Sequence, residues 1–106
     1  MAPIRRRFKV VWDKDAVSDL EDICQFIEKD SPAAAKKVKQ TLIKLAGTLK
    51  YFPERHSFEP SLRDEGNYHF ISRWHFKIIY KVAEKEVIII AIFHTSRDVK
   101  NLKDLL

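Results

Sequence analysis

Two helical patterns meet at the Ser31-Pro32 step, with almost no chain left between them. In the first pattern, apolar residues recur at spacings of four, three and four, at Ala16, Leu20, Ile23 and Ile27. The second pattern alternates threes and fours until Pro53 ends it, along Ala35, Val38, Leu42, Leu45, Leu49 and Phe52. Such periods predict amphipathic helices, and Ser31 with Pro32 supplies an N-cap and a first helical residue. Because the link is so short, the two helices must fold back on each other as an antiparallel hairpin.

Four other stretches are typical of strands: residues 8–12, 68–72, 76–82 and 87–93. The last three are joined by short links at residues 73–75 and 83–86, which makes neighbouring strands antiparallel. Residues 87–93 are apolar at every position, so this strand is expected inside the sheet. The sequence therefore predicts one α+β domain over residues 1–106, with the order β-α-α-β-β-β. The helical hairpin packs on one face of a mainly antiparallel four-stranded sheet, and a short helix is possible over residues 100–106.

Charge is grouped along the chain. Residues 13–30 hold seven acids, whereas residues 31–52 hold five lysines and no acid. Paired amphipathic helices commonly carry complementary charge, so we expect these two segments to lie side by side, in preference to a dedicated nucleic-acid stripe. The net charge of +5 still favours an anionic partner, such as nucleic acid, the ribosome or an acidic protein.

Several kinds of site and location are disfavoured by the sequence. Cys24 is the only cysteine and lies on an apolar helical face, which indicates a core residue and a reducing compartment. The four histidines lack metal-ligand spacing, and two glycines leave no room for a glycine-rich phosphate loop, so neither a metal nor a cofactor is expected. No stretch has membrane-spanning length, and a cytoplasmic location is expected.

Alternation along the predicted strands suggests an open, basic sheet surface. If Tyr68, Phe70, Ile78 and Tyr80 face the helices, the residues between them point away: His69, Ile71, Arg73, Lys77, Ile79 and Lys81. The candidate polar groups of that open face are His69, Lys77, His94 and Arg97. Histidine, lysine and arginine together can supply the base, the acid and the cation that metal-free RNA cleavage needs. The alternative is structural, with His94, Thr95 and Ser96 bonding a chain reversal after a buried strand.

Five stretches that together cover roughly residues 9–98 form a distinctive series by their order and spacing: VVWDKDAVSDLEDICQFI, SPAAAKKV, LRDEGNYHF, FKIIYKV and VIIIAIFHTSRD. With this series the chain resembles the RelE/ParE superfamily of bacterial type II toxins. The resemblance implies a growth-inhibiting α+β toxin, of the kind used in plasmid stabilisation, that a cognate antitoxin neutralises by wrapping a partly disordered segment around it. It also implies one of two targets, the ribosome with its mRNA for RelE-like members or DNA gyrase for ParE-like members.

Position-by-position comparison favours the ParE-like branch. The lysines of the ribonuclease members fall here on His69 and Ile71, one of their arginines falls on Lys77, and their second arginine matches Arg97. Their C-terminal tyrosine has no counterpart, since residues 98–106 contain none. A gyrase poison is therefore preferred, with HTSRD at residues 94–98 as a target-contact edge. The alternatives are a RelE-like ribosome-dependent mRNA endonuclease, in which His69, Lys77, His94 and Arg97 are catalytic, and a non-toxic scaffold that binds an antitoxin.

Overall fold

The sheet has the strand order β1-β4-β3-β2 in the computed structural model, which describes residues 7–95. The principal elements are β1 (Lys9–Trp12), α1 (Lys14–Glu28), α2 (Pro32–Gly47), β2 (Tyr68–Arg73), β3 (Phe76–Val82) and β4 (Glu86–His94). β1 runs parallel to β4, and the other neighbouring pairs are antiparallel, so the sheet is mixed. The predicted α+β architecture is confirmed, whereas the C-terminal helix and the HTSRD residues after Thr95 lie outside the described residues.

Each helix of the hairpin begins at a side-chain cap, and the cap of the second helix, Ser31, is the predicted one. Asp13 accepts a hydrogen bond from the backbone N–H of Asp15, and the Ser31 hydroxyl accepts one from Ala34 at 3.1 Å, with Pro32 as the first helical residue. The second helix ends at Gly47 and continues as a 3-10 turn, Thr48–Lys50, so the predicted end near Phe52 was too late.

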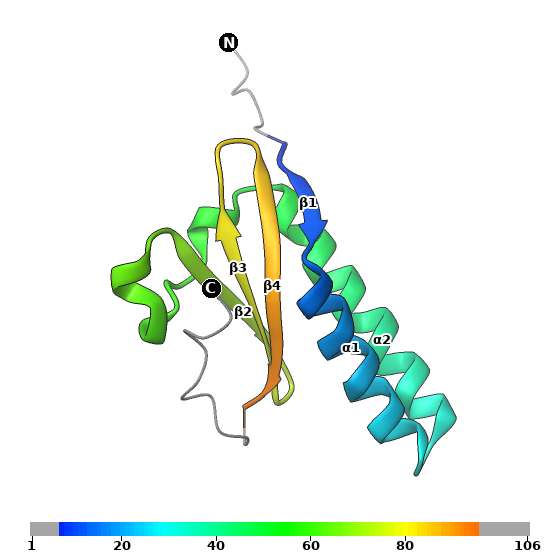
Figure 1. Cartoon of the computed structure of the whole chain (residues 1–106). Helices are drawn as coiled ribbons and strands as arrows, with labels where there is room; N and C mark the ends of the chain where they lie inside the picture. Colours follow the sequence, from blue (N-terminus) through cyan, green and yellow to red (C-terminus); the bar gives the residue numbers. More distant parts are fainter. Residues whose placement is uncertain (1–6, 96–106) are drawn as a thin grey trace.

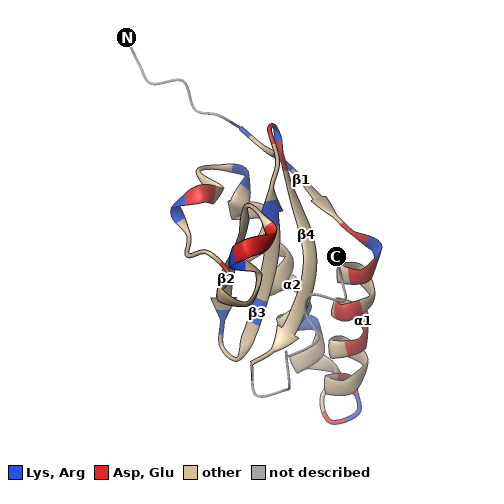
Figure 2. Cartoon of the chain, turned by 60° about the vertical axis from the view of Figure 1, so that its left-hand side comes forward, with Lys and Arg blue, Asp and Glu red and all other residues tan. Residues whose placement is uncertain are grey.

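The acidic and lysine-rich segments lie side by side, with the acids spread along α1 (Figure 2). Among the described residues no ion pair joins the two helices, because most of these charges point to solvent. Their complementarity is therefore an arrangement of surface charge, with little direct pairing to stabilise the hairpin.

The helices cover one face of the sheet, here called the helix face (Figure 1). Its fully buried side chains include Leu42 from α2, Leu49 from the 3-10 turn after it, and Ile78, Tyr80 and Ile89 from the sheet. Cys24 packs at the margin of this core, and burial raises the pKa of its thiol. The periodic apolar residues of both helices thus form the main core, as their spacing predicts.

One half of β4 lacks a strand neighbour on the side of β1. Pairing between the two strands stops at Trp12 and Ile89, because α1 begins just beyond β1. Beyond that point, the Asp19 carboxylate of α1 accepts a hydrogen bond from the backbone N–H of Ile92 at 3.0 Å. A helix side chain therefore satisfies an edge amide that no strand reaches.

The other face of the sheet, here called the outer face, is not open as expected. Residues 53–66, here called the wrap segment, fold around the free edge of β2 (Figure 1). Ser57 and Glu59 make backbone hydrogen bonds to Phe70 and Tyr68 at 3.0 and 2.9 Å, so the segment adds a short extra edge to the sheet. It then forms 3-10 turns over Pro60–Glu65, and Leu62 is fully buried against Tyr68, Ile79 and Ala91. The long irregular stretch of the sequence is a packed part of the fold.

None of the helices described here is long and apolar enough to cross a membrane. Within residues 7–95 there is also no cluster of three side chains that could hold a metal ion.

Candidate functional site

His69 lies on the opposite face from the one expected. It pairs with Tyr80 across β2 and β3, and both side chains therefore point to the helix face. The faces predicted for the side chains of β2 were therefore reversed. Tyr68 and Phe70 face outward, and Ile71 packs with the helix-face core. A one-residue change of register moves every side chain of a strand to the other face. His69 and Lys77 are therefore on opposite faces of the sheet.

The imidazole of His69 is 1% exposed and has a partner on every side. Its Nδ1 lies 2.8 Å from the carbonyl oxygen of His56, and its Nε2 lies 2.7 Å from the side-chain oxygen of Asn67. The ring stacks between Phe58, with centroids 4.4 Å apart, and Tyr80, at 5.7 Å. This environment holds the wrap segment to β2 and leaves no access for a substrate.

A second polar contact attaches the same segment to the sheet. The Tyr80 hydroxyl donates a hydrogen bond to the carbonyl oxygen of Pro53 at 2.6 Å, and burial raises the pKa of the phenol. His56 packs edge-on to Tyr80, and burial together with the charge of Arg55 lowers the pKa of this histidine. The helix-face end of the wrap segment is thus held by the buried phenol of Tyr80 and the buried imidazole of His69.

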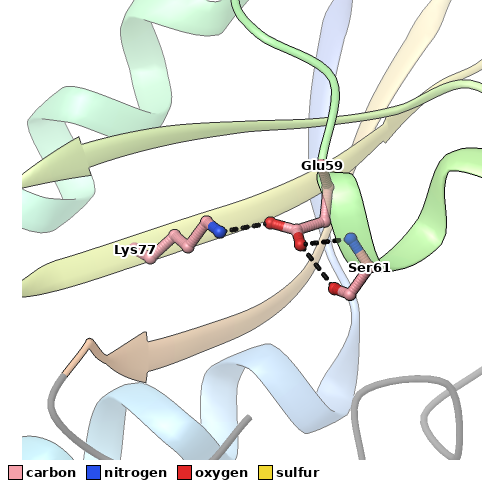
Figure 3. A network of polar contacts seen from close by, with 3 residues as sticks. All are labelled: Glu59, Ser61 and Lys77. Atoms are coloured by element: carbon pink, nitrogen blue, oxygen red, sulfur yellow. Dashed lines mark hydrogen bonds and ion pairs between the residues drawn. The ribbon is translucent and has the colours of Figure 1, made fainter. Parts of the chain in front are cut away.

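Lys77 lies on the outer face, as predicted, but it is already paired. Its Nζ lies 2.5 Å from Glu59 of the wrap segment, and the two side chains are 21% and 4% exposed (Figure 3). The other oxygen of Glu59 accepts hydrogen bonds from the backbone N–H and hydroxyl of Ser61. Burial alone would raise the pKa of Glu59, but Lys77 and Ser61 outweigh it and hold the pKa below its usual range. The Lys77 ammonium also lies 4.2 Å from the centre of the Phe70 ring.

His94 ends β4 at the far end of the sheet from His69. It pairs with Phe76, whereas His69 pairs with Tyr80, four residues along β3 and about 13 Å away at strand spacing. Its ring packs edge-on against Phe76, at 5.3 Å, and lies 5.7 Å from the ring of His75. Arg97, the fourth predicted residue, lies outside the described residues.

The structure therefore does not bring His69, Lys77 and His94 together. General acid–base cleavage needs its base, acid and cation around one reacting phosphate. Here His69 is sealed in the helix-face core, and Lys77 is neutralised by a buried carboxylate on the outer face. His94 lies at the end of β4 against Phe76, on the face opposite Lys77. Glu59 is the decisive residue that sequence reasoning missed, because nothing in an irregular segment marks which acid will be buried.

The comparisons with known proteins agree with one another. A family model described as the ParE toxin of the type II toxin–antitoxin system parDE matches residues 10–99. Among solved structures, the chain is similar to one of the chromosomal ParDE toxin–antitoxin system from P. aeruginosa. That match has 22% identity and a TM-score of 0.69, and covers 84% of this chain and 97% of the other. A second match is to the toxin–antitoxin complex RelBE2 from Mycobacterium tuberculosis, with 18% identity, a TM-score of 0.60, and coverage of 86% and 94%. No curated protein matched the sequence.

Proposed function

This chain belongs to the ParE toxin family of type II toxin–antitoxin systems, and we propose that it stops bacterial growth by poisoning DNA gyrase. In this proposal the toxin acts by binding, and no bond is cleaved by its own side chains. A cognate antitoxin holds it inactive until the antitoxin is lost.

The observation that carries the proposal is the state of Lys77. An RNA-cleaving toxin needs a free cation to stabilise negative charge that develops on the phosphate. In this chain the only described residue that matches the ribonuclease cations is held in an ion pair with Glu59, whose side chain is 4% exposed. Releasing Lys77 for RNA would leave a carboxylate buried without its partner, which is strongly unfavourable. The arrangement supports a target-binding toxin over a ribonuclease.

The antitoxin is proposed to bind with an acidic, amphipathic segment. The exposed side of α2 carries Lys36, Lys39, Lys44 and Ile43, and Ile43 is 45% exposed. Residues 36, 39 and 43 follow helical spacing, so an amphipathic segment could contact cations and apolar surface together. The two similar solved structures described above come from toxin–antitoxin systems, which supports the expectation of such a partner.

The test is controlled expression in bacteria, with growth, an SOS reporter and primer-extension mapping of mRNA ends followed in one culture. Growth arrest with SOS induction and intact message is expected. Codon-phased mRNA cuts without SOS induction would contradict gyrase poisoning and support a ribosome-dependent ribonuclease. Normal growth, with the chain stably produced, would instead support a non-toxic scaffold that only binds an antitoxin.

A further inference from the structure

The turn between β2 and β3 places a tryptophan where the backbone favours glycine. Only Trp74 and His75 separate the two strands, and Trp74 has a φ of 54°. Two-residue hairpin turns need positive φ at their first central position, which glycine and asparagine supply without steric cost. A bulky side chain in that region costs folding free energy, and such strain concentrates at functional positions.

The strained residue is also prominent on the surface. The indole of Trp74 is 47% exposed, and the guanidinium of Arg73 lies over it, 5.0 Å from the ring centre. The backbone N–H of Thr95 donates to the carbonyl oxygen of His75 at 2.6 Å, which ties the turn to the end of β4. Arg73, Trp74, His75 and His94 therefore form one cationic and aromatic surface, here called the turn tip, with no acid among these four residues.

We propose that the turn tip contacts the toxin's target, with Trp74 entering an apolar pocket of a protein partner and Arg73 pairing with carboxylates at its rim. Tryptophan and arginine are the residues most enriched where a few side chains dominate protein binding. Stacking on Arg73 limits the motion of the indole before binding, which reduces the entropy lost on contact.

A protein partner fits the turn tip better than nucleic acid. Platforms for single-stranded nucleic acid place several aromatic rings along a basic groove. The turn tip offers one large ring, of which Arg73 already covers one side, and the nearest lysine of β3, Lys77, is neutralised by Glu59. The geometry is that of a single projecting side chain with an adjacent charge.

The inference rests on the proposed function, because it assumes a macromolecular target. It is tested with full-length chains carrying Trp74→Ala or Trp74→Gly, binding to purified DNA gyrase and to ribosomes as separate probes. Both variants remove the indole, but only glycine relieves the positive φ. Trp74→Gly should therefore melt at a higher temperature than Trp74→Ala, reversing the usual order of the two residues. Both should bind gyrase at least about tenfold more weakly than the wild type, which a purely structural role would not produce.

Phe52 gives a matched control, because it also has positive φ, at 49°, and is 54% exposed. Phe52→Gly and Phe52→Ala should show the same order of melting temperatures with unchanged gyrase binding. Gyrase binding as tight as that of the wild type in both Trp74 variants would overturn the turn-tip proposal. It would also be overturned if, at both positions, the variants with lower melting temperatures were the ones that bound gyrase more weakly.

If the wild type bound ribosomes in place of gyrase, the gyrase proposal would fail. Weaker ribosome binding by both Trp74 variants would in that case still support the turn tip as a target contact. Binding of the wild type to neither probe would overturn both proposals.

Discussion

The two faces of the sheet are closed by different means. On the helix face, two amphipathic helices bury a continuous set of apolar side chains. On the outer face, one irregular segment buries a single large apolar side chain, Leu62, and holds its position through the ion pair of Glu59 with Lys77. The first face relies on many equivalent contacts, and the second relies on a few specific ones. The loss of one contact should therefore have different consequences on the two faces.

The largest expected effect on stability comes from truncating one buried leucine on each face and comparing the two losses. Leu42 on the helix face and Leu62 on the outer face are both fully buried. Leu42→Ala should lower the free energy of unfolding by about 3–5 kcal/mol, because a cavity forms between rigid layers. Leu62→Ala should cost about 2–3 kcal/mol, because the wrap segment can relax toward the sheet. Urea denaturation measures both values, and an equal or larger cost at Leu62 would contradict the comparison.

The two leucine substitutions should also differ in which parts of the chain they destabilise. After Leu62→Ala, amide hydrogen exchange should quicken mainly in residues 53–66, since that segment can open without the helices. After Leu42→Ala, exchange should quicken throughout the sheet and both helices. Uniform acceleration in both variants would show that the two faces form one cooperative unit.

The difference between the two faces also explains which parts of the fold could be predicted from the sequence. The hairpin and the strands follow from periodic apolar residues such as Leu20 and Leu42, because repeated spacing records which side of an element is buried. The position of His69 does not follow, since β2 is half-buried on both sides and its alternation fits either face. The contact of Glu59 with Lys77 depends on a segment without a period, and tertiary packing alone decides it. The sequence therefore could not show that His69 and Lys77 lie on opposite faces of the sheet, or that Lys77 is paired with a buried acid.

A third prediction uses the unequal burial of the two partners in the ion pair of Glu59 with Lys77. Lys77→Met keeps the apolar stem over Phe70 but leaves Glu59 buried without its cation, so it should cost about 2–4 kcal/mol. Glu59→Gln should cost less, about 1–2 kcal/mol, because the amide can keep a hydrogen bond with Ser61 and Lys77 can turn toward water. The double variant should recover part of the loss of Lys77→Met. Equal costs for the two single variants, measured by urea denaturation, would contradict the unequal burial of the pair.

The pH dependence of stability should expose the same ion pair. The pKa of Glu59 is lowered in the folded protein, so its ionised form stabilises the fold. That stabilisation is fully present above the usual glutamate range and is lost as pH falls through the lowered folded pKa. Glu59→Gln should therefore flatten the acid limb of a plot of unfolding free energy against pH. An acid limb of unchanged slope would show that other carboxylates control it.

The smallest expected effect concerns a partly buried carboxylate on the helix face, that of Asp19. Burial raises its pKa, the hydrogen bond from Ile92 only partly opposes that rise, and no cation pairs with it among the described residues. The sign is opposite to that of Glu59: the folded state binds the proton more tightly, so ionisation of Asp19 weakens the fold as pH rises from the usual aspartate range through the raised pKa. Asp19→Asn keeps an acceptor for the Ile92 amide and removes this penalty. It should leave stability within about 0.5 kcal/mol at pH 4 and raise it by up to about 1 kcal/mol at pH 7. A loss of stability at pH 7 would mean that the ionised carboxylate itself is needed on the unpaired edge of β4. Glu59 and Asp19 would then differ in their partners but not in the sign of their contribution to stability.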